Sequence, residues 1–172
     1  MHVLKQNERH RVAFTLNGEP VEGHAEPRML LTDFIRHEIG ATGTHVGCEH
    51  GICGACTIRL EGRAVRACLM LAVQVNGKRI ETIEGLAGPD GKLSVLQEAF
   101  HRNFALQCGY CTPGFLMSLA DYLERRPDPT EAEIREALSG NLCRCTGYAE
   151  IVNAALEAAR ELAAQQSTQA AE

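Results

Sequence analysis

Eight cysteines, arranged in two sets of four, constrain the fold of this 172-residue chain more than any other feature. The two sets are Cys48, Cys53, Cys56 and Cys68, followed by Cys108, Cys111, Cys143 and Cys145. The N-terminal residues contain no apolar run long enough for the core of a signal peptide. We therefore expect the thiols in a reducing compartment, the cytoplasm, where clustered cysteines are metal ligands more often than disulfides. Four structural disulfides are the alternative.

The first set follows the spacing Cys-x4-Cys-x2-Cys-x11-Cys. With this spacing, plant-type ferredoxins hold a [2Fe–2S] cluster through four thiolates. Such a centre is anionic, so backbone N–H groups must surround its sulfurs, and Gly47, Gly51 and Gly54 permit the turns that aim them inward. A zinc site built from four cysteines is the alternative. Structural zinc usually takes two separated cysteine pairs, whereas three of these ligands share one glycine-rich loop, so the spacing favours the cluster.

The second set consists of a Cys-x2-Cys pair and, after a long gap, a Cys-x-Cys pair. By themselves these pairs are less specific, because a Cys-x2-Cys pair also occurs in redox-active sites and in zinc sites. Each pair stands just before a predicted helix start, at Thr112-Pro113 and at Thr146-Gly147. Two helix N-termini would direct partial positive charge at one anionic centre. Residues 143–145 must be loop, because two cysteines separated by one residue do not share a helical face.

Composition and charge exclude several classes of partner. Hydrophobic residues make up 45% of the chain and charged residues 23%, which is ordinary for a globular protein of one domain or two small ones. The net charge of −5 and the pI of about 5.8 give no reason to expect nucleic acid as a partner. No run approaches the roughly 18 apolar residues that a membrane span needs.

The first half of the sequence predicts short strands around one helix. Asn17-Gly18, between two short alternating runs, predicts a hairpin. The predicted strand pairs are 12–16 with 19–24, 58–60 with 64–65, and 73–75 with 79–83. A helix is predicted over 27–40, because apolar residues recur there at helical spacing and a glycine ends the run. The segment 43–56, which carries three cysteines, is predicted to be loop.

Beyond the glycine-rich segment 85–92, the sequence predicts four helices. Ser94 with Gln97, and Thr130 with Glu133, form capping boxes, and Thr112-Pro113 is a typical first turn. The last predicted helix covers 151–164. The expected fold class is α+β, with a flexible N-terminus at 1–10, a strand-rich domain at 11–85, an all-α four-helix domain at 92–164 and a flexible tail at 165–172.

Three sequence strings resemble one known family, the small iron–sulfur subunit of the molybdenum hydroxylases. The strings are GCEHGICGAC at 47–56, QCGYCTPG at 107–114 and NLCRCTGY at 141–148. The family includes xanthine dehydrogenase, aldehyde oxidoreductase and aerobic carbon monoxide dehydrogenase. The resemblance extends over roughly residues 11 to 162 and includes all eight ligand positions.

The resemblance implies a ferredoxin-like β-grasp domain followed by a four-helix domain, each holding one [2Fe–2S] cluster. It implies an electron path from a molybdopterin-bound molybdenum in a large subunit, through the C-terminal and then the N-terminal cluster, to FAD in a medium subunit. In that family the residues equivalent to Gln107 and Cys145 lie against the pterin cofactor. A chain of this length resembles the small subunit of an αβγ or (αβγ)2 complex, and by itself it is not expected to turn over substrate.

Two other functions are open at the level of the sequence. An independent two-cluster ferredoxin would carry the same cysteines, and a zinc-organised interaction module would use them without redox chemistry. His50 suggests a Rieske-like ligand, but four cysteines already complete the first site. Arg144 either offsets cluster charge or points to solvent, and Tyr110 either stacks near a cluster or packs. The sequence does not identify the substrate, because the family places substrate contacts on the large subunit.

Overall fold

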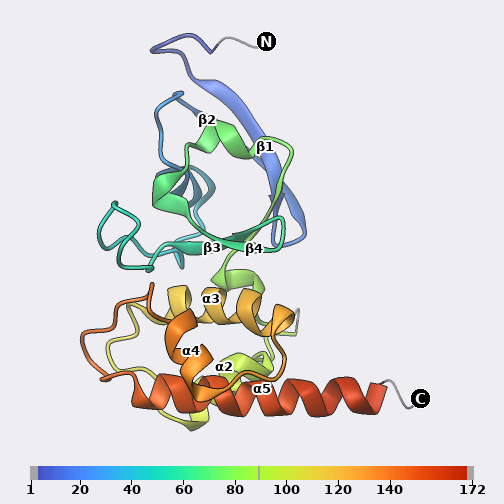
Figure 1. Cartoon of the computed structure of the whole chain (residues 1–172). Coiled ribbons are helices and arrows are strands. Elements are labelled where there is room, and N and C mark those ends of the chain that lie inside the picture. The colour runs from blue at the N-terminus through green and yellow to red at the C-terminus, as the bar shows by residue number, and fades with distance from the viewer. Residues whose placement is uncertain (1–3, 89, 170–172) are drawn as a thin grey trace.

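The computed structural model describes residues 4–88 and 90–169. The strands belong to the first half of the chain and the longer helices to the second, and the two halves are stacked one on the other (Figure 1). The predicted order, a strand-rich half followed by a helical half, is confirmed.

Five strands form one mixed sheet, and they are β1 His10–Leu16, β2 Glu19–Ala25, β3 Thr57–Leu60, β4 Arg63–Arg66 and β5 Arg79–Glu81. Their order is β2-β1-β5-β3-β4, so β5 is central, parallel to β1 and antiparallel to β3. Two of the three predicted strand pairs, β1–β2 and β3–β4, are confirmed. Their two-residue turns, Asn17-Gly18 and Glu61-Gly62, have positive φ at all four residues, the conformation that matches the twist of the flanking strands.

The prediction of a strand over 73–75 is wrong. Residues Ala72–Val75 form a 3₁₀ helix, in which Ala72 and Val75 are three residues apart and both fully buried. The backbone N–H of Leu71 donates to the Gln74 side chain at 2.8 Å and closes the turn. Alternating apolar residues predict a strand, but burial on a three-residue period determines the local conformation here.

The helix predicted over 27–40 is present from Leu31, four residues later than expected. It begins as α1, Leu31–Asp33, and continues as a π-helix over Phe34–Ile39 that ends at Gly40, where φ is +88°. Leu31, Phe34 and Ile35 are fully buried in the core of the first half. Before α1, residues 27–28 form a turn, and Leu30 is extended and forms a bridge with Leu71.

The second half contains α2 Val95–Arg102, α3 Thr112–Arg125, α4 Glu131–Ala137 and α5 Ala149–Gln169. Both predicted capping boxes are present, at the start of α2 and of α4. α5 continues five residues past its predicted end at 164, and the hydroxyls of Ser167 and Thr168 donate to carbonyls one turn earlier. α3 packs directly beneath β3 and β4, and α5 runs along the base of the molecule (Figure 1).

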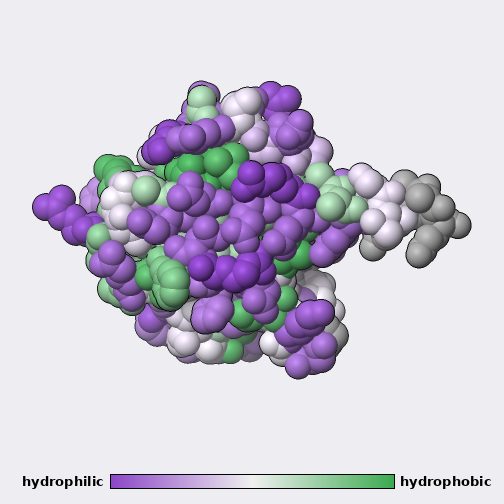
Figure 2. Space-filling model, turned by 90° about the horizontal axis from the view of Figure 1, so that it is seen from below, coloured by the Kyte–Doolittle hydropathy of each residue, from purple (hydrophilic) through white to green (hydrophobic). Residues whose placement is uncertain are grey.

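Each half has its own hydrophobic core. Phe14, Phe34 and Ile58 belong to the core of the first half, and Phe100 and Phe115 to that of the second. Seen from below, the surface of the helical half is mostly hydrophilic, and its apolar side chains form separate patches (Figure 2). Among residues 4–88 and 90–169, no helix has the length and apolar composition to cross a membrane.

Candidate metal centres

The first three cysteines of the first set lie on the loop before β3. The sulfur of Cys48 accepts hydrogen bonds from the backbone N–H groups of Cys53 and His50, both at 3.4 Å. These two N–H groups, Cys53 first, lower the pKa of the Cys48 thiol to about 6. Backbone N–H groups therefore surround this sulfur, as the glycine-rich sequence of the loop predicts.

The four thiols of the first set are neighbours two by two: Cys48 lies beside Cys53, and Cys56 lies beside Cys68, which follows β4. Burial raises the pKa of the Cys56 thiol to about 11, although the backbone N–H of Cys68 acts in the opposite direction. Cys53 and Cys56 also interact electrostatically, which connects the two pairs into one group.

The second set has the same arrangement, with Cys111 beside Cys143 and Cys145 beside Cys108. Burial raises the pKa of the Cys111 thiol to about 12. Burial also opposes ionisation of Cys143, but hydrogen bonds from the hydroxyl and the N–H of Thr146, at 3.2 and 3.5 Å, outweigh it and lower the pKa.

The structure thus brings together each of the two predicted sets, with the four thiols of each set in two neighbouring pairs. Within the described ranges 4–88 and 90–169, no three histidine, cysteine or acidic side chains converge on a single metal ion. The thiols meet two by two.

The helix starts behind the second set are placed unequally. α3 begins at Thr112 with Cys111 itself as its N-cap, one residue before the expected cap. α5 begins only at Ala149, so three residues separate it from Cys145. Residues 143–145 are loop, as predicted, and the N–H of Cys143 donates to the hydroxyl of Tyr148 at 2.9 Å.

The loops that carry the two sets touch each other at Gly54. A Cβ added to Gly54, whose φ is +76°, would lie 2.6 Å from the carbonyl oxygen of Gly140. A Cβ on Gly114, in α3, would lie 2.2 Å from the Gly54 carbonyl oxygen. Both positions require glycine, because a methyl group would separate the two halves.

Asn141 is the contact residue to which sequence reasoning gave no role, although it opens the string 141–148. It is 2% exposed, and its Nδ2 donates to the Gly54 carbonyl at 3.3 Å. Its Oδ1 accepts from the Ser118 hydroxyl at 3.0 Å. The next residue, Leu142, donates its N–H to the Cys53 carbonyl at 2.9 Å. An asparagine two residues before a ligand pair was the available signal, but its partners are distant in the sequence.

The remaining predicted site residues lie at the surface. Gln107, Cys108, Arg144 and Cys145 are all exposed, and the contact between Cys108 and Cys145 brings the segments of Gln107 and Cys145 together. His50 is exposed and its ring nitrogen bonds the backbone carbonyl of Cys48.

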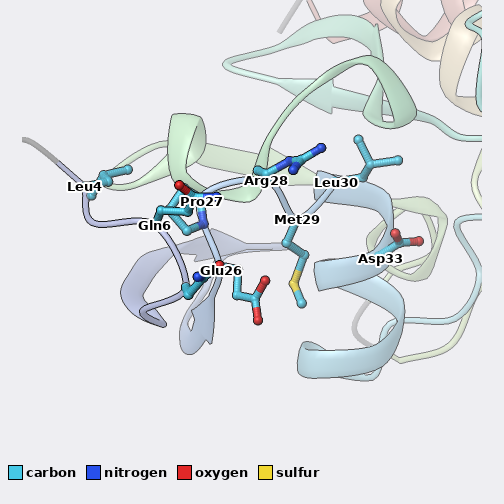
Figure 3. A pocket seen from close by; sticks show the side chains of 9 residues that line it. Leu4, Gln6, Glu26, Pro27, Arg28, Met29, Leu30 and Asp33 are labelled. Atoms are coloured by element: carbon cyan, nitrogen blue, oxygen red, sulfur yellow. The ribbon is translucent and has the colours of Figure 1, made fainter.

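One cavity, of about 610 Å3, lies away from these centres. It is lined by residues 4, 6 and 7 of the N-terminal segment and by 26–30 and 33, and Figure 3 shows its side chains, with Arg28, Glu26 and Asp33 among them. None of the lining residues is a cysteine, so this cavity is separate from the candidate centres.

Comparison with known proteins defines the class first. Residues 14–87 match the family described as 2Fe-2S iron-sulfur cluster binding domain, and residues 82–156 match the [2Fe-2S] binding domain family. The chain is therefore an iron–sulfur protein with two [2Fe–2S] binding domains.

Individual relatives define the family. The chain is 55% identical over 149 residues to the caffeine dehydrogenase subunit gamma of Pseudomonas sp. strain CBB1, covering 84% of this chain and 88% of the relative. It is 44% identical over 156 residues to the xanthine dehydrogenase iron-sulfur-binding subunit of Escherichia coli O157:H7, covering 90% and 97%. The crystal structure of quinoline 2-oxidoreductase from Pseudomonas putida 86 matches with a TM-score of 0.88 and 48% identity, over 91% of this chain and 97% of that one.

A larger protein carries the same fold as one of its parts. The aldehyde oxidoreductase of Desulfovibrio gigas matches with a TM-score of 0.85 and 38% identity, over 91% of this chain and 17% of that one. The chain belongs to the family of small iron–sulfur subunits of the molybdenum hydroxylases. The ferredoxin-like first half and helical second half expected from the sequence resemblance are confirmed.

Proposed function

We propose that each set of four thiols holds one [2Fe–2S] cluster and that each pair of neighbouring thiols binds one iron. The proposed ligands are Cys48, Cys53, Cys56 and Cys68 for the first cluster, and Cys108, Cys111, Cys143 and Cys145 for the second. The pairing of the thiols is the observation that carries this proposal, because a two-iron centre needs two thiolates at each iron. When bound, such a cluster takes up and releases single electrons.

We infer that the chain is the electron-transfer subunit of a multi-subunit molybdenum hydroxylase. It would relay electrons from the molybdopterin site of a large subunit, through the two [2Fe–2S] clusters, to FAD in a medium subunit, within an αβγ or (αβγ)2 complex. Exposure of Gln107, Cys108 and Cys145 supports contact of the second centre with the cofactor-bearing subunit. Gln107 and Cys145 would contact the pterin cofactor.

We also propose that the two halves of the chain are the two domains that the sequence predicts. The mixed sheet supports a β-grasp domain at 11–85, and α2 to α5 support a four-helix domain at 92–164. Of the proposed flexible ends, residues 1–3 and 170–172 lie outside the described residues. We place the complex in the cytoplasm, where free thiols persist for cluster assembly.

The test is anaerobic purification of the protein with its bound partners, followed by metal, sulfide and flavin analysis. We expect two clusters' worth of iron and acid-labile sulfide per chain, together with molybdenum and flavin. A cluster-loaded monomer without molybdenum or flavin would instead indicate an independent two-cluster ferredoxin. A colourless zinc protein without labile sulfide would show a zinc-organised interaction module and overturn the cluster assignment.

A further inference from the structure

One pair of aromatic side chains connects the loops of the two cysteine sets. Tyr110 lies between Cys108 and Cys111, and His45 lies three residues before Cys48. Their rings are stacked, with centroids 4.7 Å apart and an interplanar angle of 21°. The two stacked rings therefore connect the backbone just before Cys48 with the segment between Cys108 and Cys111.

Two hydrogen bonds add direction to this stack. The Tyr110 hydroxyl donates to the backbone carbonyl of Val46 at 2.6 Å. The Nδ1 of His45 lies 2.7 Å from the Tyr110 carbonyl oxygen and donates to it, because a carbonyl oxygen only accepts. Each side chain thus binds the backbone of the other segment. Two hydrogen bonds and one aromatic stack at the same place fix both the distance between the two segments and their relative orientation.

The pair also lies close to a proposed ligand. A Cβ added to Gly47 would be 3.1 Å from the Cys53 sulfur and 3.8 Å from Cε1 of Tyr110. The backbone at Gly47 thus lies close to the Cys53 sulfur and slightly further from the Tyr110 ring. The Tyr110 ring therefore lies beside the backbone that leads into Cys48.

Burial does not explain the arrangement, since Tyr110 is 49% exposed. The other end of the same loop is held separately, by Leu142 at the Cys53 carbonyl and by Asn141 at the Gly54 carbonyl. The second half of the chain therefore contacts the first cysteine loop at two points, before Cys48 and after Cys53. The His45–Tyr110 pair makes the first of these contacts.

We propose that His45 and Tyr110 are positioning residues that set the separation and orientation of the two cluster sites. The inference rests on the proposed function, in which one electron leaves the second centre, which is oxidised, and enters the first, which is reduced. Neither His45 nor Tyr110 changes its own oxidation state or protonation in this step. They act by holding the two loops at one separation.

The experiment measures the magnetic interaction between the two reduced clusters in the purified complex. At low temperature this interaction splits or broadens the EPR signals, and it depends on the separation and orientation of the two centres. The variants are Tyr110→Ala, Tyr110→Phe and His45→Ala. Tyr122→Phe is the matched control, because it removes a tyrosine hydroxyl from a partly buried position of α3 that packs against the helical core.

We expect Tyr110→Ala and His45→Ala to lose the splitting while iron and labile sulfide stay at the level of the unmodified protein. Tyr110→Phe, which keeps the ring but not the bond to Val46, should show a reduced splitting, and Tyr122→Phe should show none of these changes. An unchanged splitting in both Tyr110→Phe and His45→Ala overturns the proposal, even if Tyr110→Ala fails to assemble. Absence of cluster signals from the unmodified protein would instead contradict the proposed function.

Discussion

At the scale of single residues, the cysteines differ in electrostatic environment although their roles are alike. Backbone N–H groups lower the pKa of Cys48 to about 6, whereas burial raises that of Cys111 to about 12. The thiolate is the form that binds iron, so Cys48 is ready to bind at neutral pH and Cys111 has to lose its proton to the incoming metal.

This difference predicts unequal alkylation of the cluster-free protein. The pKa of Cys48 lies below the ordinary 9.0, so its reaction rate with iodoacetamide should rise through about pH 6 and then level off. Cys111 should stay protonated and unreactive across the neutral range, since its pKa lies above 9.0. Mass spectrometry of the labelled peptides provides the rates. Equal labelling of the two residues at neutral pH would contradict the assignment.

The proposed ligand sets predict separate losses. Cys53→Ser should remove the first cluster and leave the second detectable, because Cys53 pairs with Cys48 and its partners do not include the second set. Cys143→Ser, the matched control, should do the reverse. EPR of the reduced variants distinguishes the two signals. Loss of both from either variant would show that the two halves do not assemble their centres independently.

At the scale of elements, the contact of α3 with the first cysteine loop depends on two glycines. The approach of Gly114 to the Gly54 carbonyl leaves no room for a side chain. This contact, together with Asn141, holds the helical half against β3 and β4.

Gly114→Ala should therefore destabilise the protein by about 1–3 kcal/mol, the usual range for overpacking. Gly140→Ala is the control, because a Cβ there meets only the flexible end of the Arg66 side chain, at 2.8 Å. Denaturant unfolding of the two variants gives the comparison. If Gly140→Ala were the more damaging of the two, the close approach of α3 would not be the limiting contact.

The elements also show what a sequence can predict. The hairpins were predictable because Asn17-Gly18 and Glu61-Gly62 determine their turns locally. The 3₁₀ helix at 72–75 was not, because burial against distant residues determines it. Likewise, spacing identified both cysteine sets, but the pairing of thiols and the His45–Tyr110 contact join segments far apart in the chain.

At the scale of the whole molecule, the proposed function brings the second centre into contact with the large subunit. We expect Gln107→Ala to raise the Kd for the large subunit by up to about tenfold, the loss of one interfacial hydrogen bond. Cluster content should not change. Gln165→Ala, at an exposed position near the far end of α5, is the control. Unchanged affinity of Gln107→Ala in a binding assay would remove Gln107 from the interface.

The central place of β5 has a consequence for biosynthesis. Because residues 79–81 lie between β1 and β3, the sheet cannot close until this late segment has left the ribosome. All four thiols of the first set have emerged by then, while Asn141 and Leu142, which later cover the loop at Gly54, are still to be translated. During synthesis there is thus an interval in which the four thiols of the first set can come together while the loop at Gly54 is still uncovered.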